Sequence, residues 1–333
     1  MKVGKLPSEL LDKYIFEKSK NAQIGRKEVV LRPGVGEDCA VIDPETEMIV
    51  LSADPITGAC ENIGRLLVNV NANDIYSCGC VPFGLMITLL LPPNFSEEEL
   101  DRLSTDIFRE TKKAGLEVLG GHTEITDAVN RPIVSAAVVG KTIDRKFVKT
   151  GGAAVGQDVV MTKYAALEGT AILAADNEEK LKGILPKEAV ERAKALSLSL
   201  SVRKEALKAA ELGASSMHDI TEGGVLGACF EIADGSKTGI TVYADKIPVL
   251  DETKEICSLF GVNPLRLISS GSLLICINNG EELVNALKKE GINAAVIGKI
   301  TAGEKTVIIN NKREVLGEPQ ADEIYSARLR ENV

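Results

Sequence analysis

The chain has 333 residues, of which 44% are hydrophobic and 26% are charged, so it is long enough for two globular domains with buried cores. Its formal net charge of -9 argues against a surface that binds nucleic acid. An acidic protein can still bind anions locally, through backbone N–H groups or through a bridging metal ion.

The first residues carry Lys2, Lys5, Glu9, Asp12 and Lys13 without a long apolar run, which is not the pattern of a signal peptide. The longest apolar stretch, residues 85–91, is too short to span a bilayer. We therefore expect a cytoplasmic protein without a membrane partner. The seven cysteines are scattered through apolar segments, so we expect them to be free and buried.

The first half of the chain alternates strand and helix patterns. A strand is predicted over residues 48–52, followed by an acidic turn at Asp54. Apolar spacing predicts a helix over residues 63–77, and a strand follows at 85–91. Ser96 is typical of a helix N-cap, with the helix ending near residue 114. Strands at 118–119 and 133–139 then flank a predicted loop, residues 120–131.

A glycine-rich junction at residues 150–156 predicts a domain boundary, which gives domains 1–150 and 151–333. After it the alternation restarts. Strands are predicted at 159–162, 240–242, 272–277, 294–298 and 306–309, and helices at 170–175, 186–198, 202–212 and 281–290. A turn at residues 218–224 is predicted to open a further helix that runs to residue 233. This alternation indicates an α/β (α+β) fold in both halves.

Four short segments combine acidic residues with glycines or polar amides. They are Gly34-Val-Gly36-Glu37-Asp38, Asn71-Ala-Asn73-Asp74, Gly120-Gly121-His122-Thr123-Glu124 and His218-Asp219-Ile-Thr-Glu222-Gly-Gly224. Glycine lets a backbone approach a phosphate closely, and Mg²⁺ usually takes one or two carboxylates from the protein. Dispersed acids of this kind suit a nucleotide that is held through metal. The two commoner nucleotide-binding glycine motifs are absent from the sequence.

Each segment also has a plain structural interpretation. Asp219 can cap the helix that begins near Glu222, and His122 can be an ordinary loop histidine. Lys163 follows the first strand of the second domain, where it can contact a phosphate or be an exposed charge at the strand end. The four segments together favour the nucleotide interpretation.

In their order along the chain and in their residues, these segments resemble the motifs of the AIR synthase-related (PurM-like) superfamily. The resemblance covers nearly the whole chain. The resemblance is greatest to HypE-like hydrogenase maturation proteins, and it includes the stretch Arg266-Leu-Ile-Ser-Ser-Gly-Ser-Leu-Leu274. It implies an N-terminal mixed sheet that pairs across a homodimer and a C-terminal α/β sandwich domain. ATP would lie in the cleft between the two domains.

The same resemblance implies roles for single residues. Asp38, Asp74 and Asp219 would bind Mg²⁺, while Asn73 orients the nearby backbone. Gly120, Gly121 and Thr123 would line the phosphates of ATP. Lys163 is a further candidate for binding ATP because of its position after the strand, and His122, Glu124 and His218 are the candidate catalytic residues. The shared chemistry of the family is ATP-driven activation or phosphorylation of a small-molecule acceptor.

One departure concerns the C-terminus. Dehydratases of the HypE type end in a cysteine that carries the reacting group, whereas the last cysteine in this sequence is Cys276. The expected function is therefore a HypE-like ATP-dependent enzyme with another acceptor, with a partner maturation protein as a further expectation. Two alternatives stay open: a kinase of the thiamine-monophosphate type, and a nucleotide-binding protein without catalysis.

Overall fold

The computed structural model describes residues 29–31, 34, 36–37, 39–43, 46–57 and 62–329. These residues form two compact units that are joined at residues 147 and 148. The N-terminal unit contains the first strand and residues 39–147. The C-terminal unit contains the rest of the chain from Val148, together with Gly34, Gly36 and Glu37.

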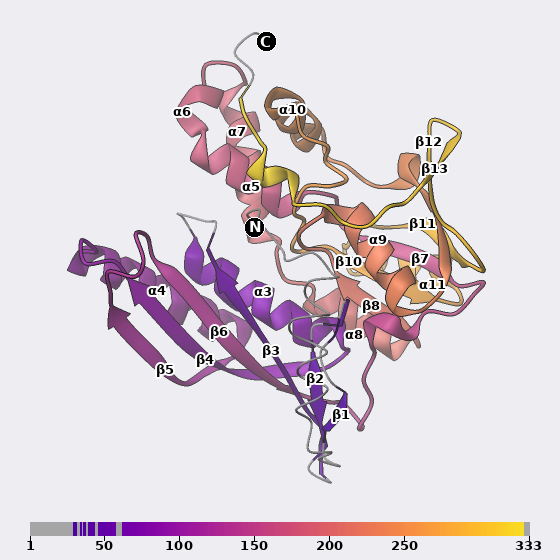
Figure 1. Ribbon diagram of the computed structural model, residues 1–333, viewed down its shortest axis with the longest axis horizontal. Helices are drawn as coiled ribbons and strands as arrows, with labels where there is room; N and C mark the ends of the chain where they lie inside the picture. Colours follow the sequence, from indigo (N-terminus) through magenta and orange to yellow (C-terminus); the bar gives the residue numbers. More distant parts are fainter. Residues whose placement is uncertain are drawn as a thin grey trace. The chain divides into compact units, whose positions relative to one another are not determined.

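The N-terminal unit is a six-stranded mixed sheet covered by two helices on one face (Figure 1). In sheet order the strands are β1 (Val29–Leu31), β2 (Ala40–Ile42), β3 (Ile49–Ile56), β6 (Ile133–Lys141), β4 (Val81–Leu91) and β5 (Glu117–Ile125). Only the β4–β5 pair is parallel among the described pairs of this sheet. The helices are α3 (Ile63–Ser77) and α4 (Glu97–Ala114).

Helix boundaries in this unit follow local chemistry. Helix α3 has the bounds that its apolar spacing predicts. Helix α4 begins after Ser96, whose hydroxyl accepts the N–H of Glu99 while the Glu99 carboxylate accepts the N–H of Ser96. This capping box satisfies two backbone donors at once. The helix ends at Gly115, where φ is +72° and glycine carries no steric penalty.

Strand β5 was not predicted in full. The predicted loop over residues 120–131 is wrong in its first half, because β5 continues through Gly120, Gly121 and His122 to Ile125. Gly121 has φ +151°, and a Cβ there would lie 1.8 Å from the carbonyl oxygen of Ile87 on β4. Glycine is thus required at this position for the two strands to approach each other.

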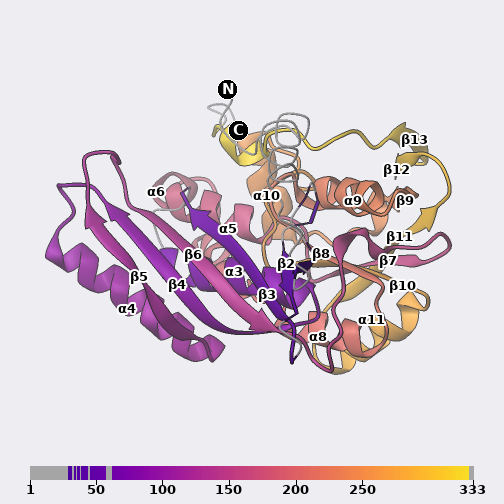
Figure 2. The same cartoon turned by 60° about the horizontal axis from the view of Figure 1, so that its bottom comes forward.

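The C-terminal unit contains a seven-stranded sheet with helices on both faces (Figure 2). In sheet order the strands are β13 (Lys312–Val315), β12 (Lys305–Ile309), β9 (Gly239–Tyr243), β11 (Ala294–Thr301), β7 (Asp158–Thr162), β10 (Leu273–Ile277) and β8 (Ser216–Asp219). Its α-helices are α5 (Leu167–Asp176), α6 (Glu178–Leu181), α7 (Lys187–Ala195), α8 (Arg203–Glu211), α9 (Gly224–Gly235), α10 (Asp251–Phe260) and α11 (Gly280–Lys289). Short 3-10 turns lie at Thr150–Gly152, Leu196–Leu198, Ala244–Lys246 and Glu323–Tyr325.

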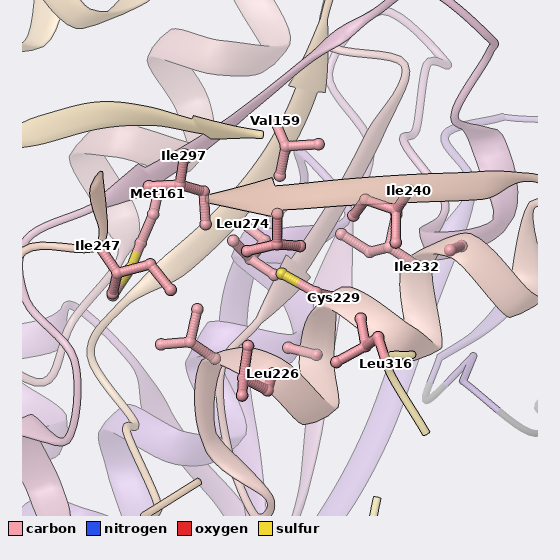
Figure 3. Packing of buried hydrophobic residues seen from close by; sticks show 14 of the residues in the cluster. Val159, Met161, Leu226, Cys229, Ile232, Ile240, Ile247, Leu274, Ile297 and Leu316 are labelled. Carbon is pink, nitrogen blue, oxygen red and sulfur yellow. The ribbon is translucent and has the colours of Figure 1, made fainter. Parts of the chain in front are cut away.

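The core of this unit lies between α9 and one face of the sheet. Figure 3 shows Leu226, Cys229 and Ile232 of α9 against Met161 and Leu274 of the sheet. Val160, on the other face of β7, lies against α11, where a Cβ at Gly280 would be 3.0 Å from its side chain. A second apolar cluster joins α5, α7 and α10. Both faces of the sheet are therefore covered, as expected for an α/β sandwich domain.

Six of the seven cysteines lie in the part of the chain that the structure describes, and all six are free and buried, as predicted. Burial raises the pKa of Cys276 to about 12, so its thiol is held in the neutral form. The seventh, Cys60, falls outside the described residues.

Candidate functional site

Asp74 lies in the last part of α3, on the face that covers the sheet. Only 3% of the residue is exposed, and its Oδ2 accepts the hydroxyl of Ser52 on β3 at 2.6 Å. The Ser77 hydroxyl donates to the Asp74 carbonyl oxygen at 2.8 Å. These contacts fix the carboxylate and the helix turn that carries it.

Asn71 fixes the same helix to the same strand. Its Oδ1 accepts the Asp54 N–H at 3.0 Å, and its Nδ2 donates to the carbonyl oxygens of Asp54 and Leu67. Asp54 is therefore part of strand β3, and the predicted acidic turn at this residue is wrong. Asn73, which lies between Asn71 and Asp74 in the sequence, is fully buried. Asp74 is thus presented by a helix that polar side chains hold in one position.

Asp38 lies outside the described residues. The residue after it, Cys39, donates its thiol to the carbonyl oxygen of Asp74 at 3.4 Å. Nearby in the sequence, Gly36 has φ +70°, and a Cβ there would lie 3.5 Å from the carbonyl oxygen of Glu231 on α9. Gly36, from the segment at residues 34–38, therefore packs against α9, the helix that follows the segment at residues 218–224.

Gly120, Gly121 and Thr123 lie on β5, away from Asp74 within one chain. The strand register aligns Gly121 with Ile87, Ala136 and Asp54 across β4, β6 and β3. Three strand spacings separate β5 from β3, which is about 14 Å. The structure of one chain does not bring these glycines next to the Asp74 carboxylate.

His122 and Glu124 point away from the helices that cover the sheet. Side chains alternate along a strand, and the Ser52 contact places even-numbered β3 residues on the covered face. The register then puts His122, aligned with Thr88, Ser135 and Pro55, on the open face. His122 Nε2 lies 3.5 Å from Glu124 Oε2, and both side chains are more than half exposed. This pair can act only on a group that reaches the open face.

His218 and Asp219 lie in strand β8 rather than in the predicted turn. His218 is 3% exposed, and its Nε2 lies 2.9 Å from Glu231 Oε2 on α9. The pair joins the strand to the helix inside the C-terminal unit. Asp219 is 1% exposed on the same strand, where it pairs with Leu273 of β10. Glu231, thirteen residues from His218, was not identified from the sequence.

Lys163 is not an exposed charge at a strand end, because only 16% of its side chain is exposed. Its ammonium donates to the carbonyl oxygens of Ser199, Ser201 and Gly271 at 2.6–3.0 Å and pairs with Glu205 at 2.8 Å. An ammonium has three protons, which match the three carbonyl oxygens, and Glu205 supplies the opposite charge. Burial lowers the Lys163 pKa, and the Glu205 carboxylate opposes that shift. Lys163 therefore joins three segments of the C-terminal unit.

Among the described residues, no three His, Cys, Asp or Glu side chains are grouped as a metal cage. Such a cage is not required for Mg²⁺, which usually takes one or two carboxylates and keeps several waters. Asp74 alone, with its fixed carboxylate, fits that coordination habit. Within the same residues, none of the helices combines the length and apolar character that crossing a bilayer requires.

Comparison with known proteins places these two units in one family. Residues 36–142 match the N-terminal domain of AIR synthase related proteins, and residues 154–310 match the C-terminal domain. A Methanocaldococcus jannaschii protein, assigned by name to hydrogenase expression and formation, is 29% identical over 342 residues, with 96% of both chains covered.

Two solved structures have the same fold. One is HypE in a HypE–HypF complex, with TM-score 0.75 and 21% identity, which covers 92% of this chain and 100% of the other. The second is ThiL, the thiamine monophosphate kinase of Aquifex aeolicus, in a complex with AMPPCP and TMP. It has TM-score 0.74 and 21% identity, and the match covers 95% of this chain and 98% of the other. With both domain matches covering most of its length, the chain belongs to the AIR synthase related family.

Proposed function

We propose that this protein binds ATP with Mg²⁺ and uses it to activate or phosphorylate a small-molecule acceptor. The observation that carries this proposal is Asp74, a buried carboxylate fixed by Ser52 in the family's N-terminal domain. The ThiL relative, whose structure contains an ATP analogue, supports the nucleotide part. Asp38 and Asp219 are proposed as further Mg²⁺ ligands on the sequence resemblance.

In this proposal the bound Mg²⁺ neutralises charge on the transferred phosphoryl group. The protein itself mainly positions the reactants. Ser52 and Asn71 hold Asp74 and α3 in place, so little reorganisation is needed when the nucleotide binds. Lys163 and His218 are assigned to the framework of the C-terminal unit, because their polar atoms already have partners there.

The experiment for this function is Mg²⁺-dependent ATP hydrolysis by the purified protein, alone and with carbamoyl or phosphate acceptors. Acceptor-dependent turnover supports an enzyme. Saturable ATP binding without turnover on any acceptor favours a nucleotide-binding partner protein instead.

A kinase acting on thiamine monophosphate is the second candidate. It is favoured by the ThiL structure, which is as similar to this chain as the HypE structure is. Conversion of thiamine monophosphate by the protein with Mg·ATP supports this candidate. Absence of conversion under conditions where a ThiL enzyme is active removes it. The HypE–HypF complex likewise leads us to propose a partner maturation protein, which co-purification with a HypF protein tests.

We also propose that two copies pair through the open face and edge of the N-terminal sheet. Strands β4 and β5 expose Met86 and Leu119, each about half exposed, and all nine residues of β5 are exposed. Exposed apolar side chains along an unpaired edge strand are typical of an interface. A second copy would cover them, and would also bring another protein surface to His122 and Glu124.

Leu119→Glu is expected to convert the dimer into a monomer, because it places a charge inside the proposed apolar contact. Sedimentation measures the mass. Phe108→Glu on α4 is the matched control, since Phe108 is also exposed but lies on the helix side. A wild-type monomer at micromolar concentration, or equal masses for all three proteins, would contradict this pairing.

A further inference from the structure

Four segments of the C-terminal unit meet around Glu168, in the first turn of α5. The Ala166 N–H donates to Ser269 Oγ at 2.8 Å, and the Gly169 N–H donates to the Ile268 carbonyl oxygen at 3.0 Å. These bonds fix the start of α5 against residues 268–270. The turn before α9 and the segment at residues 322–325 complete the group.

Only one of the two oxygens of the Glu168 carboxyl group has hydrogen-bond partners among the described residues. The residue is 6% exposed, and Ser270 donates both its backbone N–H and its hydroxyl to the carboxyl group. Among the described residues, the buried Oε2 atom has no hydrogen-bond partner. A buried carboxyl oxygen without a donor is costly, and native proteins rarely leave one so without a functional reason.

Two further carboxyl groups act on Glu168. Asp322 accepts the N–H groups of Gly223 and Ile324, each at 2.8 Å. Glu222 accepts the hydroxyl of Tyr325 at 2.8 Å. Burial and these like charges raise the pKa of Glu168 to about 7, and burial with the charge on Glu222 raises the pKa of Asp322 to about 6. The charges that shift these two groups are all negative.

We propose that Glu168, Glu222 and Asp322 form a binding site for a small organic cation with N–H donors, such as an alkylammonium or amidinium group. The cation would donate to the bare Oε2 of Glu168 and relieve the repulsion among the three carboxyl groups. A phosphate would instead add negative charge to the same place. All three carboxyl groups belong to the C-terminal unit, and the site does not depend on nucleotide binding.

The protonation of Glu168 fixes the direction of the pH dependence. Below about pH 7 its carboxyl holds a proton in the ligand-free protein, and a cation must displace it. Affinity should therefore rise as pH rises, about tenfold between about pH 6 and about pH 8 for one group of this pKa. Burial, the hydrogen bond to Glu222 and the nearby negative charges raise the pKa of Tyr325, so its phenol stays protonated throughout this range.

The test is calorimetric titration of the full-length protein with n-butylammonium and with acetamidinium, and with n-butanol as the neutral control. We expect saturable binding of at least one cation at up to about 50 mM, which suits ligands of so few atoms. About half a proton should be released at about pH 7 and about one at about pH 6, measured in two buffers of different ionisation enthalpy. Glu168→Gln should weaken binding at least about tenfold and remove the pH dependence. Glu255→Gln, on the exposed side of α10, should change neither.

No saturable binding of either cation, or equal affinity in the wild type and in Glu168→Gln, would overturn the site. If Glu168→Gln does not fold, Glu222→Gln takes its place, with weaker cation binding expected and unchanged binding as the contrary result. Because these titrations contain no nucleotide, their outcome is separate from that of the ATP experiments.

Discussion

Replacing Asp74 with Asn is expected to weaken the binding of Mg·ATP by about 100-fold or more, which corresponds to about 2.7 kcal/mol. Asn has nearly the shape of Asp and can still accept the Ser52 hydroxyl, so the fold should persist. It lacks the negative charge that attracts Mg²⁺, and a neutral amide is a much weaker ligand. Calorimetric titration of each protein with a non-hydrolysable ATP analogue and excess Mg²⁺ measures the effect.

Asp101→Asn provides the control for Asp74→Asn. Asp101 is exposed on α4 and offers the same chemical change without a buried, fixed carboxylate. The free energy of unfolding of each variant should differ from that of the wild type by about 1 kcal/mol or less. An unchanged nucleotide affinity in Asp74→Asn would remove Asp74 from the metal site.

Lys163→Met is expected to lower the free energy of unfolding by about 3–5 kcal/mol, because it leaves a buried charge without its partner. The Glu205 side chain is 3% exposed and the Lys163 side chain 16%, so water cannot replace the ammonium. Three backbone carbonyl oxygens would lose their donor at the same time. Met keeps most of the aliphatic stem, so the loss should come from the polar contacts. Urea denaturation followed by circular dichroism gives the value.

Lys254→Met provides the comparison, since the Lys254–Asp251 pair has similar chemistry on the surface and both side chains are mostly exposed. Such pairs contribute about 0.5 kcal/mol or less. A Lys163→Met protein as stable as Lys254→Met would mean that the buried lysine does not join the three segments as described.

The parts of the fold that were predictable have strong local signals. Helix α3 follows from apolar spacing, and α4 follows from the Ser96 cap. Strand β5 was missed beyond residue 119 because an exposed edge strand with paired glycines has no apolar alternation. Its existence depends on pairing with β4 and on the close approach at Gly121, and both are tertiary effects.

The sequence predicted the acidic residues of the candidate site but not the residues that hold them in place. Asp74 stood out in the sequence, but Ser52, which fixes its carboxylate, is 22 residues away and follows no recognisable spacing. Glu205 and Glu231 escaped notice for the same reason, because ordinary helix glutamates acquire meaning only from long-range contacts. The strand that holds His218 and Asp219 was read as a turn because four buried residues are too few to show a period.

The most direct test of the central claim is a titration of the wild-type protein with ATP, once with Mg²⁺ and once with a chelator in its place. The account predicts saturable binding that requires Mg²⁺, because the fixed carboxylate of Asp74 repels the phosphates unless a cation lies between them. Failure to bind ATP in Mg²⁺, or equal binding in the chelator, would contradict it.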